Sequence, residues 1–435
     1  MVGQQAAATL IASPPGIGTN SDGTLELFAI STAGQLCHIR QNPDLTWPAA
    51  WAPVVTGDSF VIADADRPSV ATIGAIVHVA VRAKDGAVIL YQQHGAGYVQ
   101  QSLGGPFTSP PVVTADSDGQ PTVFVKFAND IVQQWRPEPN RPNLLAYDPR
   151  AGVAECYSID SEGDIAMMRA NTGWTGSWYL GVAARLAGTS LPAMLVYDAT
   201  AGLGNFYTVD QQGRITLLKS NTGWRTTWSR IASGNLTGGP FDDLLFYDPI
   251  QGTAELYTTD GQGNITLIRS YAGWRTTWSI LVSANFTGGM FDDLLLYDPQ
   301  AGGGELYTTD GHGNLTLVKS YTGWRTGWTH ILPGHFTASR FTDLLFYDEI
   351  GGYAELYSAD GQGGLILHST FTGWQGWTFA IVGYFTGRPF TDLFLYNPVN
   401  ETGELYIADG AGNLMLAHTY PITSHDWAFV MPLSG

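Results

Sequence analysis

Short apolar runs alternate with turn-forming residues along most of the chain. Four successive runs read LLFYDP, ELYTTDG, NITLIRS and WSILVSANF (244–286), and Gly, Asp, Asn or Pro bounds each of them. Runs of this length that are rich in Leu, Ile, Tyr, Phe and Thr are typical of β-strands. No stretch keeps an apolar spacing of 3.6 over three helical turns. The pattern therefore predicts an all-β chain with almost no helix.

The pattern of four runs is repeated. A Tyr closes the first run of each copy, and successive copies lie 50 residues apart with one interval of 49, at Tyr147, Tyr197, Tyr247, Tyr297, Tyr347 and Tyr396. The segment TTDGQGN (258–264) suits a tight hairpin, because Asp and Gly tolerate the left-handed backbone of short turns. Each copy thus predicts a four-stranded antiparallel sheet. Many copies of such a sheet, each covering the face of the next, are typical of a β-propeller.

The first 140 residues contain three more divergent copies, at 25–55, 77–93 and 121–136. We therefore predict a single β-propeller over 1–435, with nine blades in one ring, three of them divergent (1–140) and six close repeats (141–435). The alternative is a six-bladed ring over 141–435 with a separate N-terminal β unit. The single ring is preferred because three blades cannot close by themselves and the first copy matches the later ones.

Pairs of tryptophans mark the same place in six copies. The segment TGWRTTWS (222–229) is one example, and twelve of the fourteen Trp form the pairs Trp47/Trp51, Trp174/Trp178, Trp224/Trp228, Trp274/Trp278, Trp324/Trp328 and Trp374/Trp377. A buried indole contributes a large apolar area, so at least one member of each pair is expected to pack between blades. The other member is a candidate platform for a sugar ring, whose hydroxyl groups need polar partners nearby.

An arginine follows the first Trp of three copies, and an aspartate opens the next copy: Arg225 with Asp243, Arg275 with Asp293 and Arg325 with Asp343. Where Thr175 replaces the Arg, the opener is Ala193, whereas Gln375 is followed by Asp392. This co-occurrence predicts Arg–Asp pairs across neighbouring blades, a bidentate role that suits Arg over Lys. The alternative is that each Arg reaches a hydroxyl or carboxylate of a bound sugar.

The N-terminal copy, DGTLELFAISTAGQLCHIRQ with its two Trp, resembles the blades of bacterial fucose-binding propeller lectins and tectonin-like propellers. The later copies, with the pattern NFTGGMFDDLLLYD, resemble FG-GAP repeats. The lectin resemblance implies glycan binding in clefts between blades, against Trp and polar side chains, with fucosylated or other cell-surface sugars as partners. FG-GAP repeats often bind calcium, but the loops at 285–293 and 335–343 lack the alternating carboxylates that calcium requires. We therefore expect no metal and no cofactor.

Charge and composition exclude several partners. The net charge of −18 makes nucleic acid and anionic membranes poor partners. No run of 18 apolar residues predicts a membrane span, and the N-terminus lacks the basic segment of a signal peptide. The sequence thus predicts a soluble protein, either cytoplasmic or released by a route without a signal peptide, although a leader removed by processing would leave the same N-terminus. Cys37 and Cys156 lie in apolar runs and are expected to be buried free thiols.

No motif for catalysis is evident, because the nine His show no metal-ligand spacing and no nucleophile motif or phosphate loop is present. The Tyr–Asp and Thr–Asp–Gly carboxylates recur in every copy, whereas a catalytic pair is expected at one place only. The sequence therefore predicts a multivalent carbohydrate-binding propeller and no enzyme. The first alternative is a protein-interaction scaffold without a small ligand. The second is an enzyme whose site lies in the central channel.

Overall fold

The computed structural model describes residues 10–55, 61–62, 66–73, 76–84, 86–94, 97–103, 107–115, 121–126, 132–135, 142–174, 176–189, 191–388, 390–422 and 426–433. Every regular element within these residues is a β-strand, as the run pattern predicts. The chain divides into two compact units, a first unit of Met1–Pro137 with Gly387–Pro389 and a second unit of Glu138–Thr386 with Phe390–Gly435.

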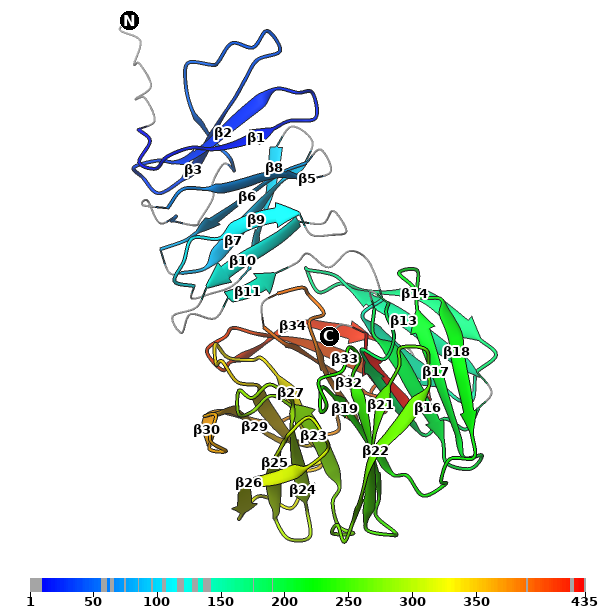
Figure 1. Cartoon of the computed structure of the whole chain (residues 1–435). Helices are drawn as coiled ribbons and strands as arrows, with labels where there is room; N and C mark the ends of the chain where they lie inside the picture. Colours follow the sequence, from blue (N-terminus) through cyan, green and yellow to red (C-terminus); the bar gives the residue numbers. More distant parts are fainter. Residues whose placement is uncertain are drawn as a thin grey trace, which may run out of the picture. The chain divides into compact units, whose positions relative to one another are not determined.

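The second unit contains six four-stranded antiparallel sheets, which we call the first to sixth blades (Figure 1). From the inner to the outer strand, the first blade consists of β35 (Phe429–Pro432), β12 (Leu144–Asp148), β13 (Val153–Ile159) and β14 (Ile165–Thr172), and the second of β15 (Leu180–Ala184), β16 (Ala193–Asp198), β17 (Leu203–Val209) and β18 (Ile215–Thr222). The third consists of β19 (Arg230–Gly234), β20 (Asp243–Asp248), β21 (Thr253–Thr259) and β22 (Ile265–Ala272), and the fourth of β23 (Ile280–Ala284), β24 (Asp293–Asp298), β25 (Gly303–Thr309) and β26 (Leu315–Thr322). The fifth consists of β27 (His330–Gly334), β28 (Asp343–Asp348), β29 (Tyr353–Ala359) and β30 (Leu365–Thr372), and the sixth of β31 (Phe379–Gly383), β32 (Asp392–Asn397), β33 (Thr402–Ala408) and β34 (Leu414–Pro421).

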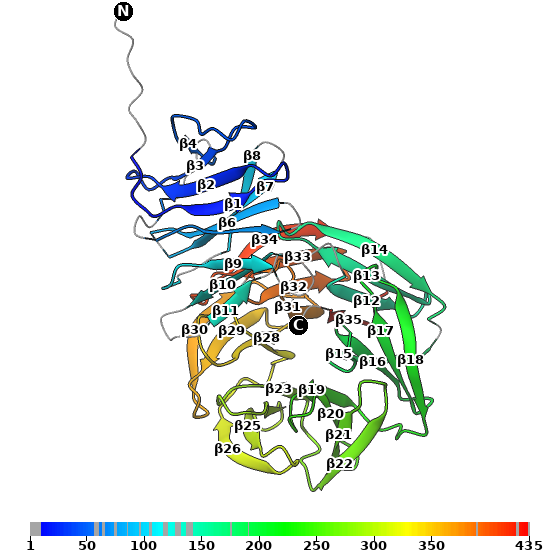
Figure 2. The ribbon, with the colours of Figure 1, turned by 45° about the horizontal axis from the view of Figure 1, so that its top comes forward.

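These six blades form a closed ring. The last strand, β35, pairs with β12, with Tyr147 opposite Phe429 and Leu144 opposite Pro432. The inner strands lie side by side in the cyclic order β35, β15, β19, β23, β27, β31 and back to β35 (Figure 2). The prediction of nine blades in one ring is therefore wrong, because the sixth blade meets the first and leaves no gap for three more. The alternative of a six-bladed ring and a separate N-terminal β unit is what the described strands form.

The burial of each strand explains its composition. The second strand of each blade is buried along almost its whole length, and its Tyr is at most 1% exposed in all six blades. Apolar side chains of neighbouring blades meet in common clusters, such as Tyr197 and Phe206 of the second blade with Phe246 of the third. The outer strand is mostly exposed, and a bulge shifts its register in each blade, for example opposite Leu256 and Tyr257. Such a bulge disfavours pairing of this free edge with another strand.

The loop from the first to the second strand explains the repeated FG-GAP-like pattern. In the fourth blade Phe291 lies over Gly311 of its own blade and Gly238 of the preceding blade, where a Cβ atom would approach its ring to 2.5 and 2.7 Å. Both glycines have positive φ angles. Asp293 is 1% exposed and accepts hydrogen bonds from the Phe286 and Thr287 backbone N–H groups at 2.8 and 2.7 Å. The Phe and Asp of the FG-GAP-like pattern therefore stabilise this loop, the Phe by packing on two glycines and the Asp by accepting backbone hydrogen bonds.

The first unit contains three sheets. They are β1 (Gly16–Thr19), β2 (Leu25–Ile30), β3 (Leu36–Arg40) and β4 (Ala52–Pro53); β5 (Ser69–Ile73), β6 (Ile76–Arg82), β7 (Val88–His94) and β8 (Gly97–Ser102); and β9 (Val112–Ala115), β10 (Pro121–Lys126) and β11 (Val132–Trp135). The inner strands β1, β5 and β9 lie next to one another in this order. Phe28 and Tyr91 belong to an apolar cluster shared by the first two sheets.

We predict that Asp343 makes the stability of the ring depend on pH. Burial raises the pKa of this fully buried carboxyl from 3.8 to about 6. The folded state therefore binds a proton more tightly than the unfolded state, and the resulting stabilisation, on the order of 1–3 kcal/mol, is present below about pH 4 and is lost as the pH rises through about 6. Denaturant unfolding at several pH values should show the wild type losing stability relative to Asp343→Asn between pH 4 and 7.

The matched control is Asp310→Asn, because Asp310 is exposed and hydrogen bonds from Asn314 and His312 hold its pKa at about 2. The Asp310 carboxyl titrates below pH 4. The difference in unfolding free energy between Asp310→Asn and the wild type should therefore stay constant between pH 4 and 7. A constant difference for Asp343→Asn as well would contradict the prediction.

Candidate functional site

The Trp-bearing loops lie at the seams between blades, where the outer strand of one blade leads to the inner strand of the next. Trp224 lies against Gly204 of the second blade, where a Cβ atom would come within 2.2 Å of the indole. Gly304 leaves the same space for Trp324, with 2.6 Å to its ring. Only glycine admits the indole so close to the strand, so the first Trp of these seams is held against the preceding blade.

The second Trp of the pair is the buried member. Trp228, Trp278 and Trp328 are 4–5% exposed, and Trp228 packs against Phe246 of the third blade with ring centroids 5.6 Å apart. The first members, Trp224, Trp274 and Trp324, are half-buried. The expectation that one indole of each pair packs between blades is met at these three seams, and the other indole keeps part of its surface open.

The three arginines cover the second Trp and pair with a glutamate. The guanidinium carbon lies 4.9, 5.0 and 5.8 Å from the ring centroid of Trp228, Trp278 and Trp328. Arg225 Nη2 lies 2.5 Å from Glu255 Oε1, Arg275 Nη2 lies 2.6 Å from Glu305 Oε1, and Arg325 Nε lies 3.4 Å from Glu355 Oε1. Each glutamate stands on the third strand of the blade that the loop leads into.

The predicted Arg–Asp pairs are therefore wrong. Asp243, Asp293 and Asp343 are at most 1% exposed, and their carboxylates accept backbone N–H groups of the loop from the first to the second strand. That loop lies at the other end of the inner strand from the Trp loop. A buried carboxylate that already holds two N–H groups has a local structural role, and the guanidinium pairs instead with a glutamate beside the Trp.

A tyrosine completes each polar cluster. Tyr257 and Tyr357 donate their hydroxyl hydrogens to Glu255 and Glu355 at 2.5 and 2.7 Å, and Tyr307 donates to Glu305. Burial and the adjacent carboxylate raise the pKa of Tyr257, so the phenol stays protonated and remains a donor. Arg, Glu and Tyr thus offer donors and acceptors within reach of one another, beside an indole face.

The recurrent Tyr–Asp pair positions the Trp loop. Tyr247 donates to the carbonyl oxygen of Arg275 at 2.6 Å, and Tyr297 donates to that of Arg325 at 2.6 Å. Asp248 accepts the Thr227 hydroxyl at 2.5 Å and also the Ile250 backbone N–H at 2.9 Å. These carboxylates and phenols therefore have structural roles, because their hydrogen bonds fix the loop that carries Trp and Arg.

Cavities open beside two of these clusters. One of about 180 Å³ is lined by Trp224, Arg225, Trp228, Glu255 and Tyr257. The other, of about 190 Å³, is lined by the equivalent residues Trp324, Arg325, Trp328, Glu355 and Tyr357. These volumes lie below the 300–1,000 Å³ typical of drug-sized ligands, so each cavity suits a single small ring. We call the seams at Trp224, Trp274 and Trp324 the three complete seams.

The other seams differ in the same residues. Trp174 and Trp178 are both buried, Thr175 lies outside the described residues, and Asn205 stands where the complete seams have Glu. At Trp374 and Trp377 the loop is one residue shorter, and Gln375 lies against Gly352. Trp427, buried at the seam between the sixth and first blades, packs against Tyr396 with ring centroids 4.5 Å apart.

The glutamates and tyrosines were missed by the sequence interpretation, although a signal for them existed. The motif ELY places Glu255, Glu305 and Glu355 each 30 residues after the corresponding Arg. Where Arg gives way to Thr175, the same position holds Asn205. The loss of both charges together at one seam is the correlation that indicates the pair.

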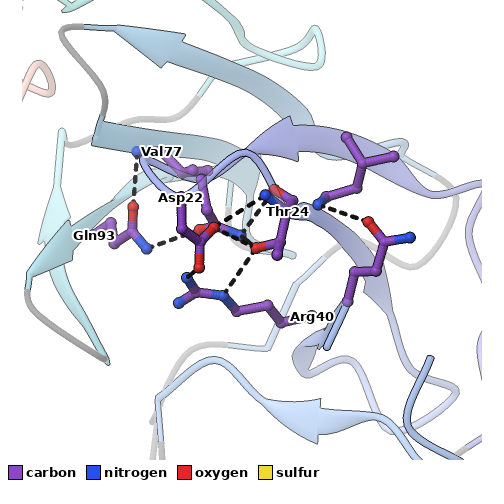
Figure 3. A network of polar contacts seen from close by, with 8 residues as sticks. Asp22, Thr24, Arg40, Val77 and Gln93 are labelled. Atoms are coloured by element: carbon purple, nitrogen blue, oxygen red, sulfur yellow. Dashed lines mark hydrogen bonds and ion pairs between the residues drawn. The ribbon is translucent and has the colours of Figure 1, made fainter. Parts of the chain in front are cut away.

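The pair Trp47/Trp51 of the first unit has different surroundings. Trp47 is 40% exposed and Trp51 is half-buried. Nearby, Asp22 accepts hydrogen bonds from Thr24 and Arg40 at 2.6 and 2.8 Å, and these bonds hold its pKa at about 2 (Figure 3). In the same network Gln93 accepts the Val77 N–H at 3.3 Å. Asp22 and Arg40 border a cavity of about 470 Å³ whose lining includes neither Trp.

Within the ranges described, no three His, Cys, Asp or Glu side chains are grouped so that they could hold a metal ion. None of the described segments forms a helix long and apolar enough to cross a membrane. Cys37 and Cys156 are both buried free thiols.

No known protein family matches the chain, and no curated protein matches it. Among solved structures, a putative 6-phosphogluconolactonase from Bacteroides uniformis shows 10% identity and a TM-score of 0.44 over 80% of this chain and 96% of its own. A periplasmic gluconolactonase from Pseudomonas aeruginosa shows 11% identity and a TM-score of 0.41 over 82% of this chain and 99% of its own. The SapL1 lectin, solved with alpha methyl fucoside, shows 11% identity and a TM-score of 0.26 over 72% of this chain and 97% of its own.

These comparisons correct one prediction. Because two of these similar structures are named as lactonases, the prediction that the chain is not an enzyme is not kept. At 10–11% identity the likeness assigns no reaction to this chain.

We predict that Arg275 is energetically coupled to Glu305 and independent of Asp293. In a double-mutant cycle, Arg275→Ala and Glu305→Ala should show a coupling of about 0.2–1 kcal/mol, because the Arg side chain is half exposed and solvent screens the pair. Arg275→Ala and Asp293→Ala should be additive. Denaturant unfolding measures both cycles, and coupling to Asp293 with none to Glu305 would refute the assignment.

Proposed function

We propose that the second unit is a multivalent carbohydrate-binding ring, with one sugar at each of the three complete seams. The observation that carries this proposal is the recurrence, at three successive seams, of a half-buried indole beside an Arg–Glu–Tyr cluster. At two of these seams the cluster borders a cavity of about 180–190 Å³. Several weak sites on one rigid ring increase avidity without new contacts.

The chemistry of the cluster suits vicinal hydroxyl groups. The guanidinium groups are 45–50% exposed, whereas the glutamates beneath them are 11–16% exposed. A sugar could donate hydroxyl hydrogens to the carboxylate and accept N–H bonds from the fixed guanidinium fork, while its C–H face lies on Trp224, Trp274 or Trp324. The bacterial fucose-binding lectins that the N-terminal copy resembles bind sugars against Trp and polar side chains in clefts between blades.

Several of the Trp predicted to bind sugar lie outside the three proposed sites. Trp174, Trp178 and Trp374 are 7–8% exposed, so they offer little surface for stacking. Trp377 and the pair Trp47/Trp51 are more open but lack a described Arg–Glu pair. The structure therefore favours three sites on successive blades over one site at every seam.

The test is a glycan array followed by calorimetric titration of the full chain with a monovalent form of the best glycan. We predict about three equivalents per chain. Each of Arg225→Ala, Arg275→Ala and Arg325→Ala should lower the stoichiometry by one, because each removes the donor fork from one seam.

The matched control is Gln375→Ala, which changes the equivalent loop position at a seam without Arg and should leave three sites. The proposal is refuted if no glycan binds, or if the stoichiometry is the same in all three Arg variants and the wild type.

A protein-interaction scaffold is the second candidate, and the outer strands favour it. Their described residues expose large apolar side chains in each blade: Met167, Leu217, Leu218, Leu267, Ile268, Leu317, Ile366, Leu367, Met415 and Leu416 are 37–54% exposed. Exposed apolar side chains of this size are available for contacts with a partner. Under this alternative Leu267→Glu, and not Arg275→Ala, should abolish capture of a partner.

A further inference from the structure

A cavity larger than those at the seams lies on the axis of the ring, at the opposite ends of the inner strands from the Trp loops. It has a volume of about 760 Å³ and is lined by all six blades. Its walls are the last residues of the inner strands and the loops that follow, such as Ser283 and Ala284 of the fourth blade and Pro432 of the first. The cavity therefore brings side chains of all six blades together around one space.

The residues that face this cavity differ between blades, although the blades are close copies elsewhere. The position directly after the inner strand lines the cavity with Arg185, Asn285, His335 and Tyr384 in the second, fourth, fifth and sixth blades. The third blade has Asn235 at this position. The next position, by contrast, holds Leu or Phe in all five blades and is at most 2% exposed. A single asymmetric ligand on the axis meets different blades with different parts of its structure, whereas repeated ligands at the seams need equal contacts. The divergence at the axis is therefore the pattern expected of a single site.

One side of the cavity carries an excess of negative charge. Asp242 and Asp292 stand at equivalent positions of neighbouring blades. Each carboxylate accepts a hydrogen bond from a backbone N–H of the preceding blade: Asp242 from Arg185 at 2.8 Å and Asp292 from Asn235 at 2.7 Å. Arg185 lies 3.6 Å from Asp242, whereas no ion pair joins Asp292 to a cation of the described residues. Burial, together with the charges of Asp242 and Asp293, raises the pKa of Asp292, and the charge of Arg185 opposes this rise.

The other side of the cavity is uncharged and more apolar. It is formed by Pro333, His335, Val382 and Tyr384 of the fifth and sixth blades. Burial lowers the pKa of His335 and raises that of Tyr384, so both rings are neutral at pH 7. The cavity thus has a carboxylate side and a ring-lined side, across one axis.

We propose that the axial cavity binds a small molecule that carries an ammonium group on an apolar ring, with the ammonium at Asp292 and the ring against Pro333, Val382 and Tyr384. Asp242 and Asp292 together outnumber Arg185, so an ammonium group adds the positive charge that balances this side, with three donors for the carboxylate. The ring replaces water along the apolar wall. The site is independent of the sugar sites proposed at the seams.

The test is titration of the full chain at pH 7 with phenethylamine, with 2-phenylethanol as the neutral probe of the same skeleton. We expect one equivalent of the amine per chain and at least tenfold weaker binding of the alcohol. Asp292→Asn should weaken binding of the amine at least tenfold, while the amide oxygen still accepts the Asn235 N–H and keeps the fold.

The matched control is Asp260→Asn, which makes the same change of charge on the exposed turn between β21 and β22 and should leave amine binding unchanged. Equal binding of the amine and the alcohol by the wild type, or no binding of the amine, overturns the proposal even if Asp292→Asn fails to fold. Unchanged amine binding by a folded Asp292→Asn also overturns it.

Discussion

The pairing of β35 with β12 is the constraint on which the rest of the second unit depends. The four residues Phe429–Pro432, near the C-terminus, form the inner strand of the first blade. The other three strands of this blade, β12, β13 and β14, start with Leu144. Without β35 the first blade would have three strands, and the faces at the two ends of the stack would not be joined. Closure gives every blade two neighbours. Each Trp loop therefore enters a seam with walls on both sides, and the six inner strands surround one axis.

Ring closure also separates two kinds of position. At the seams, similar loops meet similar strands, so a favourable cluster such as Trp224, Arg225 and Glu255 can be repeated at Trp274 and Trp324. At the axis, equivalent positions from all blades converge on one space. Copying Arg185 into every blade there would place like charges around one cavity, which is electrostatically unfavourable. The repeated seam and the divergent axis thus follow from the same symmetry.

The sequence predicted the content of a blade better than the number of blades in the ring. Runs of about seven residues between Gly and Asp identify strands because turn chemistry and apolar periodicity agree. The ring size depends instead on a pairing between Tyr147 and Phe429, about 280 residues apart, and no local pattern encodes which repeat meets the last strand. Repeat counting found nine copies and could not show that the first three belong to another unit.

The sequence pattern also gave the wrong partner for the arginines, because it contains no information on which repeated residues meet in space. Asp293 and Glu305 both follow Arg275 at fixed intervals in the repeat, so periodicity alone cannot distinguish them. The geometry does, because the inner strand Ile280–Ala284 separates the two loops: Asp293 lies at its far end and turns toward the Phe286 and Thr287 N–H groups. Glu305, on the third strand, faces the Trp loop. A partly buried carboxylate under an exposed guanidinium leaves both charged groups accessible from the seam. An Arg–Asp pair at the far end of the inner strand would leave neither group beside the Trp.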